Sequence, residues 1–279
     1  MKLIIRVSGR MGGEKDNLVI PSCLGLLDCF NTKKNRYSKE SLCHLVTDDA
    51  VNTIFIISLF SYIYHYCDRK DTDTYEIKLS TLKQFRGQTH GSKGFDIKAE
   101  LEKLNNINCY WQDLDIDRLA EVKIKGRKAI IQSRYFSEIF KAMKYLTRKL
   151  DSTYSSSYTS LINREILIER NRSAIEITIE ICKLVERRGA LAEGQTAHLA
   201  INTLIARCPT LSFKIDSTST ISRKNQILRE DLNKAIELLK TKTRIYKVFE
   251  DLMITKPEKI AVNKEGKILI EHNGRNIGK

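Results

Sequence analysis

The segment 119–133, LAEVKIKGRKAIIQS, constrains the fold more than any other part of the chain. Apolar and charged residues alternate on both sides of KGR, which is the pattern of two antiparallel strands that meet at a glycine-containing turn. Most of the remaining chain has the spacing of amphipathic helices instead. The sequence therefore predicts an α+β fold that is mainly α with small β-hairpins.

The residues before this hairpin set its context. An apolar helix is expected over 48–67, a short strand at YEIKL, and a helix at STLKQFRG that ends at Gly87. A further helix over 95–107 and a strand at NCYWQD follow. Helix, short strand, helix, helix and hairpin is the element order of a winged helix. Residues 48–133 are thus predicted to form a first winged-helix-like domain, preceded by an arm over 1–47 with no assigned role.

The second half of the chain has a similar order. Residues 134–163 are interpreted as a connecting segment that begins with the basic amphipathic helix 134–150. Next come a long helix over 164–188, a helix TAHLAINTLIARC closed by Pro209, and LSFKID as a short strand or turn. A long helix over 217–240 and a hairpin KIAVNKEGKILIEHNG complete the chain. The prediction is a second winged-helix domain over 164–279, so that long helices join two winged-helix units.

The net charge of +14 is unevenly distributed. Residues 1–120 carry 17 basic and 16 acidic side chains, whereas residues 121–279 carry 31 and 18. An excess confined to one half suggests that this half meets a polyanion, most commonly nucleic acid. No segment has the ~18 uncharged apolar residues of a membrane span, and no signal peptide is recognisable. We expect a cytoplasmic protein without a membrane partner.

The cysteine and histidine patterns indicate no metal site. The seven cysteines are scattered without a CxxC pair, which favours reduced thiols in the core. The five histidines are dispersed, and neither glycine-rich stretch has the Lys-Ser/Thr of a phosphate-binding loop. No cofactor and no catalytic residue are predicted.

The helix over 217–240 has two distinct faces. Ile221, Leu228, Leu232, Ala235 and Leu239 recur on one face, which is expected to pack on the core. Hydroxyl residues at 219, 220 and 222 offer oxygens to the free N–H groups of the first turn. Cations at 223 and 224 occupy that turn, where they are unfavourable by ~0.3–1 kcal/mol unless an anion docks there.

The outer face of this helix suits duplex DNA. Arginine, asparagine and glutamine form two-point contacts with guanine or adenine edges, and recognition helices use their N-terminal residues for such contacts. The alternative is a merely solvated polar face. A basic terminal hairpin favours DNA, because a wing gains from phosphate contacts. The candidate DNA-binding residues of the second half are Ser222, Arg223, Lys224, Asn225, Gln226, Arg229, Asn233, Lys264, Lys267, His272, Asn273 and Arg275.

The first unit is a weaker candidate for DNA binding. Its counterpart helix carries Asp96, Glu100 and Glu102, a poor surface for phosphates. Its hairpin is basic, with the candidate DNA-binding residues Lys123, Lys125, Arg127 and Lys128 around Gly126. The hypothesis is that this unit serves dimerisation or contacts the DNA backbone through its wing. A hairpin that is merely soluble is the alternative.

Over residues 48–275 the architecture resembles that of the tandem winged-helix plasmid replication initiators. Three features carry the resemblance: the basic helices YFSEIFKAMKYLTRKL and REILIERNRSAIEITIEICKLVERRG, the helix STISRKNQILREDLNKAIELLK, and the wing KIAVNKEGKILIEHNG. The resemblance implies sequence-specific binding of double-stranded DNA at repeated origin sites of theta-replicating plasmids. It also implies a monomer–dimer equilibrium, hence a homodimer, and host replication proteins as partners.

Two other classes of function stay open. A winged-helix transcriptional regulator or a centromere-binding partition protein would make similar DNA contacts. An enzyme of DNA processing would use Tyr154 and Tyr158 as nicking nucleophiles, or the carboxylates of 113–117 as metal ligands. For the tyrosines a helical packing stripe with Leu161 is favoured, and for DLDID a loop. A non-enzymatic protein is the expectation.

Overall fold

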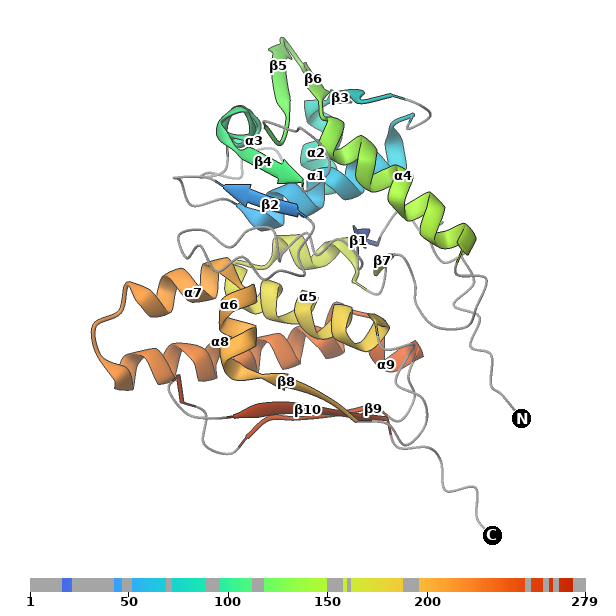
Figure 1. The fold of residues 1–279 in the computed structure, drawn as a ribbon. Coiled ribbons are helices and arrows are strands. Elements are labelled where there is room, and N and C mark those ends of the chain that lie inside the picture. The colour runs from blue at the N-terminus through green and yellow to red at the C-terminus, as the bar shows by residue number, and fades with distance from the viewer. Residues whose placement is uncertain are drawn as a thin grey trace.

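The protein is a mixture of helices and small antiparallel sheets (Figure 1). The computed structural model describes residues 17–21, 43–46, 52–68, 72–88, 96–111, 118–149, 158–159, 162–187, 196–248, 252–257, 261–262 and 266–272. Two three-stranded antiparallel sheets lie at opposite ends of the molecule, with most of the helices between them. The predicted α+β class is confirmed.

Residues 52–149, here called the first half, contain the hairpin that the alternation predicted. Lys125 pairs with Lys128, and the intervening Gly126 has a φ of 61°, a conformation that favours glycine. The strand order β3-β6-β5 places the last strand in the middle of the sheet. The elements are α1 (Thr53–Tyr66), β3 (Thr74–Lys78), α2 (Leu79–Phe85), α3 (Ile97–Lys103), a 3-10 turn η3 (Leu104–Asn106), β5 (Glu121–Lys125) and β6 (Lys128–Gln132).

The core of the first half forms around α1. Its side chains are buried from Thr53 to Ile63, and the side chain of Asn52 caps its N-terminus. The helix α4 (Arg134–Lys149) adds Phe136 and Phe140, whose rings lie 5.5 and 4.6 Å from that of Phe60. The predicted connecting helix is therefore also a packing element of the first half.

Residues 162–272, the second half, repeat the sheet order with the last strand in the middle, β8-β10-β9. The elements are a 3-10 turn η4 (Arg164–Ile168), α5 (Arg172–Arg187), β8 (Thr196–Ala200), α6 (Ile201–Arg207), α7 (Pro209–Asp216), α8 (Ile221–Thr241), α9 (Ile245–Val248), β9 (Leu252–Thr255) and β10 (Lys267–His272). Cys182 and Cys208 are buried in this half as thiols, as expected for cysteines that fill core space. Among the described helices, none combines the length and apolar content that crossing a bilayer requires.

Two helix boundaries of the second half were predicted wrongly. TAHLAINTLIARC is not one helix, because Ala197 and Leu199 alternate with exposed residues in β8 and only 201–207 is helical. LSFKID belongs to α7 and is neither strand nor turn. Pro209 begins that helix instead of closing the previous one, since its fixed φ suits a first helical position.

Three further predictions also need correction. The helix expected over 164–188 is interrupted, with a 3-10 turn before α5. The strand β10 pairs with Leu252–Thr255 and with β8. Of the residues 259–263 expected to pair with it, 261 and 262 lie outside any strand, and the others lie outside the described residues. Tyr158 lies in the short strand β7 (Tyr158–Thr159) and not on a helical stripe, and Tyr154 and Leu161 lie outside the described residues.

Short segments tie the two halves together. The strand β1 (Ile20–Pro21) pairs with β7, just before the second half, whereas β2 (Cys43–Val46) pairs with β4 (Asn108–Trp111) of the first half. The Val19 N–H donates to Ser61 Oγ at 2.9 Å, and the Leu18 N–H donates to the Ile162 carbonyl at 2.8 Å. This part of the predicted N-terminal arm is thus buried between α1 and the start of the second half.

A glycine at the end of α2 lies close to the second half. Gly87, after α2, has a φ of 66°, and a Cβ built on it lies 2.6 Å from Ile168 Cγ1 in η4. Nearby, the guanidinium of Arg164 lies 5.6 Å from the centre of the Phe85 ring. The end of α2 therefore requires a residue that has no side chain and accepts a left-handed conformation.

Replacing Gly87 with alanine is expected to lower the free energy of unfolding by about 2 kcal/mol, of which about half is backbone strain and half the clash with Ile168. Gly126→Ala is the matched control, because Gly126 has a φ of 61° but nothing within 4 Å of its Cβ position. It should lose only ~1 kcal/mol in urea unfolding. Adding Ile168→Ala should recover the difference between the two variants. Equal losses at both glycines would contradict the clash.

Candidate nucleic-acid interface

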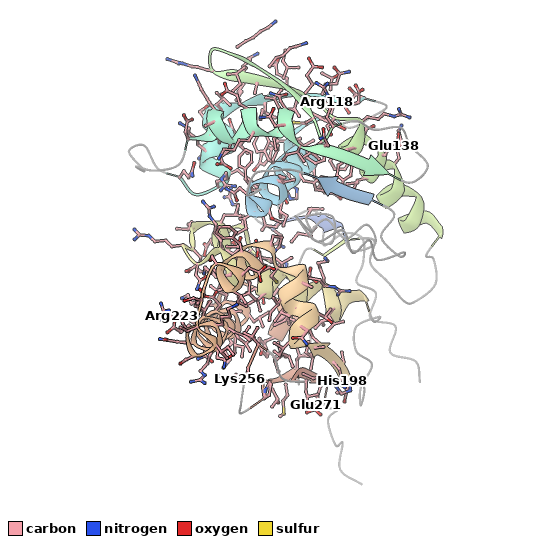
Figure 2. The ribbon with its side chains drawn as sticks, turned by 60° about the vertical axis from the view of Figure 1, so that its left-hand side comes forward. Arg118, Glu138, His198, Arg223, Lys256 and Glu271 are labelled. Atoms are coloured by element: carbon pink, nitrogen blue, oxygen red, sulfur yellow. The ribbon has the colours of Figure 1, made fainter. Side chains whose placement is uncertain are left out.

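The start of α8 extends beyond the buried core, although Ile227 in its second turn packs partly against that core. None of residues 221–227 is buried, and burial begins at Leu228 and continues through Leu232, Ala235 and Leu239. The predicted core stripe is confirmed from Leu228 onward. It is wrong for Ile221, which is 59% exposed because the core ends before the helix does. Figure 2 shows Arg223 at the outer edge of the second half.

The outward face of this helix end is polar and cationic. Ser222, Arg223, Gln226, Arg229 and Asn233 are exposed there, and the first turn contains no carboxylate. Arg223 Nη1 donates to Gln226 Oε1 at 2.9 Å, and Gln226 Nε2 donates to Glu230 Oε1 at 2.7 Å. Such exposed pairs contribute little stability and exchange readily for other partners. This face is therefore available to a polar ligand.

The hydroxyl residues before α8 do not act as predicted. Thr220 occupies the N-cap position, but its side chain makes no capping hydrogen bond. The Lys224 N–H bonds to the Thr220 carbonyl as part of the ordinary helical pattern. The helix therefore begins without the side-chain cap that usually satisfies its first N–H groups.

Two predicted base-contacting residues have partners within the chain. Asn225, which is half-buried together with its neighbour Lys224, accepts a hydrogen bond at Oδ1 from the Val262 N–H at 2.9 Å. Asn233 Oδ1 accepts one from Lys256 Nζ. Both contacts connect α8 to the segment between β9 and β10. Asn225 and Asn233 thus position the hairpin against the helix.

Lys256 is a cation of this surface that the sequence did not single out. It lies directly after β9, on the same side of the second half as Arg223 (Figure 2). Lys267, at the start of β10, is exposed as predicted. His272 ends β10, where its backbone pairs with Leu252. Lys264, Asn273 and Arg275 lie outside the described residues.

The cations of the first hairpin fall into two groups. Lys123 pairs with Glu121 at 2.8 Å, which lowers the pKa of that carboxyl, and Lys128 pairs with Glu76 at 2.6 Å. Lys125 and Arg127 flank Gly126 at the exposed tip and form no ion pair with any residue that the structure describes. The tip is thus the part of the first hairpin whose cations are most available to an anionic partner.

The two cationic surfaces do not form one cluster. The hairpin β5–β6 stands at the top of Figure 1, whereas α8 lies in the lower half beside its own sheet. Between them, α3 has the acidic character expected from the sequence. Asp96 caps this helix through the Lys98 N–H, and Glu100 pairs with Lys103 at 2.9 Å.

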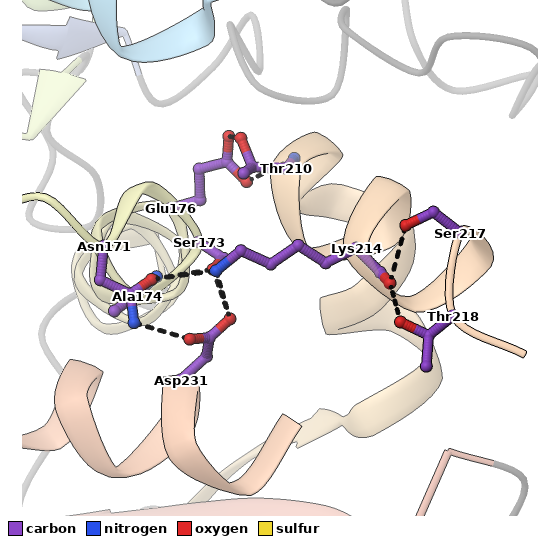
Figure 3. Close-up of polar contacts among 9 residues, drawn as sticks. All are labelled: Asn171, Ser173, Ala174, Glu176, Thr210, Lys214, Ser217, Thr218 and Asp231. Atoms are coloured by element: carbon purple, nitrogen blue, oxygen red, sulfur yellow. Dashed lines mark hydrogen bonds and ion pairs between the residues drawn. The ribbon is translucent and has the colours of Figure 1, made fainter. Parts of the chain in front are cut away.

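A buried polar network fixes α7 and α8 against α5 (Figure 3). Asp231, on α8, is 4% exposed and accepts hydrogen bonds from Asn171 Nδ2 at 2.6 Å, from Lys214 Nζ at 3.1 Å and from Ser173 Oγ. Lys214 Nζ also donates to Ser173 Oγ at 2.6 Å. A buried carboxylate is stable only with such donors, so the network fixes the relative positions of three helices.

A second buried carboxylate holds the start of α7. Glu176, on α5, is fully buried and accepts hydrogen bonds from the Thr210 N–H at 2.9 Å and from Thr210 Oγ1 at 2.7 Å. Burial raises the pKa of the Glu176 carboxyl to about 7, although these hydrogen bonds and the charge of Lys214 oppose the rise. Neither network was predicted, because its members lie far apart in the sequence.

The alternative chemical sites gain no support from the described residues. No three His, Cys, Asp or Glu side chains gather as a metal-binding group in the part of the chain that the structure describes. The carboxylates at 113–117 lie outside it, as does Tyr154. Tyr158 is described only by its backbone in β7.

Comparison with known proteins does not assign a function to this surface. No protein-family model matches the sequence. No curated protein matches it either. The functional interpretation therefore rests on the geometry of α8 and its surroundings.

Proposed function

We propose that each half of the chain is a winged-helix unit and that the protein binds double-stranded DNA in a sequence-specific manner. The second half inserts the N-terminal turns of α8 into the major groove, and its hairpin contacts the adjacent backbone. The tip of the β5–β6 hairpin adds phosphate contacts. The shared order of helices and strands in the two halves supports the winged-helix assignment.

One observation carries the proposal: α8 begins outside the buried core, with Arg223, Gln226 and Arg229 exposed and without a carboxylate in its first turn. A helix that served only stability would place acids at this end, because the helix dipole is positive there. Cations and amide side chains gain instead when phosphates and base edges meet them. The excess of basic residues after position 120 adds long-range attraction to such a partner.

The test is a binding titration with a duplex that the full chain selects from a random library. Arg223→Ala is expected to weaken binding to that duplex by roughly 1–3 kcal/mol, with a smaller effect on random DNA, if Arg223 contacts a base. Lys240→Ala is the matched control, since Lys240 is an exposed cation at the other end of α8. It should leave the specificity ratio unchanged. Failure of the parent chain to select any sequence would overturn the proposal.

Within this function we propose a role in initiating replication of a plasmid or mobile element. This role rests on the resemblance to tandem winged-helix initiators, which also implies a homodimer and host replication proteins as partners. Binding to repeated sites, followed by melting of adjacent AT-rich DNA, is the expected result in a permanganate footprint. Binding without melting would instead favour a regulator or a partition protein.

A further inference from the structure

Ile221 is an apolar side chain at the tip of the candidate interface. It is the first residue of α8 and is 59% exposed. Five large hydrophobic side chains are exposed among the described residues: Tyr66, Ile168, Phe213, Ile221 and Met253. Ile221 is the one that lies on the projecting turns of α8. More than half of its surface stays in water, so packing within the chain uses only the smaller part of this isoleucine.

The surroundings of Ile221 indicate what it contacts. Ser222 and Arg223 follow it directly and are exposed, so a single apolar side chain stands among polar and cationic ones. Polar and cationic neighbours of this kind suit base edges and phosphates better than an apolar protein partner, which requires a contiguous hydrophobic patch. The major groove of DNA, by contrast, presents one isolated apolar group, the 5-methyl of thymine. A single exposed isoleucine matches a single methyl group.

We propose that Ile221 determines specificity for a thymine by packing on its 5-methyl group. This inference rests on the proposed function, because it requires that α8 enters the major groove. The polar neighbours then hold the helix to phosphates and base edges, while Ile221 distinguishes thymine from the other bases by shape. Burying one methyl group corresponds to a change in affinity of roughly four-fold.

The experiment replaces thymine by deoxyuridine, which differs only in lacking the methyl group. The full chain first selects its preferred duplex from a random library, and each thymine of that duplex is then replaced in turn. At one position the parent is expected to lose about four-fold in affinity. Ile221→Ala should be indifferent to the replacement at that position. Ile168→Ala, which removes an isoleucine that is 60% exposed in η4, should keep the parent's sensitivity.

The outcomes separate this inference from the function on which it depends. A parent chain that selects a sequence but tolerates deoxyuridine at every thymine would overturn the role of Ile221 and leave DNA binding intact. The same holds if the selected sequence lacks thymine, or if Ile221→Ala remains sensitive to the methyl group. A parent chain that selects no sequence would overturn the proposed function together with this inference.

Discussion

Replacing Asp231 with alanine is expected to lower the free energy of unfolding by about 3 kcal/mol, or the melting temperature by roughly 6–12 °C. The carboxylate is almost fully buried and accepts hydrogen bonds from Asn171 just before α5, Ser173 on α5 and Lys214 on α7. Its loss removes the acceptor of the half-buried Asn171 amide and leaves the buried Ser173 hydroxyl with Asn171 Oδ1 alone as its acceptor among the described residues. The loss is moderated because the side chain of Lys214 is 37% exposed and can turn to water.

Asp216→Ala is the matched control for this effect. Asp216 also belongs to the α7–α8 region, but it is exposed, and among the described residues only Ser212 Oγ donates to it, at 3.5 Å. Urea unfolding followed by circular dichroism should show no loss of stability for that variant. A similar loss in both variants would mean that the buried network does not hold the helices together.

Replacing Glu176 with glutamine is expected to change how stability depends on pH. The pKa of this carboxyl is raised from 4.5 to about 7 in the folded chain, so the folded state keeps a proton that the unfolded state has already released. Stability from this group is therefore fully present below about pH 4.5 and is lost as pH rises to about 7. The loss amounts to ~3 kcal/mol at most.

Glutamine is neutral and can still bond to Thr210, with its oxygen accepting from the N–H and its amide donating to Oγ1. Urea unfolding at several pH values between 5 and 8 should therefore show a flatter profile for Glu176→Gln than for the parent, with the gain largest at the upper end. Glu237→Gln, which removes an exposed carboxylate of α8, controls for the change in charge. Identical profiles for the parent and Glu176→Gln would contradict the raised pKa.

Local sequence patterns were sufficient to predict an element where a single periodicity, of strand or of helix, dominated the segment. The alternation in EVKIK and KAIIQ predicted β5 and β6, and the glycine between them has the positive φ that the turn requires. The apolar stripe that begins at Leu228 predicted α8. In both cases the signal extends over several residues and agrees with the local backbone preferences.

Long-range pairing decided the elements that were missed. The segment TAHLA at 196–200 contains good helix formers, yet it forms the strand β8. The reason is its partner β10, which provides the hydrogen bonds and contributes the buried Ile268 and Ile270 beside it. The buried networks join residues such as Asn171 and Asp231, which are 60 positions apart. The extent of the core also cannot be read from spacing, which is why Ile221 was placed on the wrong side of the boundary between core and solvent.

If α8 reads DNA as proposed, its exposed start lets specificity change without disturbing the fold. The side chains of Ser222, Arg223 and Gln226 are exposed. Asn225 and Ile227 are different, because the first bonds to the Val262 N–H and the second packs against the core. Further along, Asp231 and the buried leucines keep the helix in place. Under the proposed function, a chain of this fold would acquire a new target sequence through changes at the exposed positions 222, 223 and 226, with little effect on how well the protein folds.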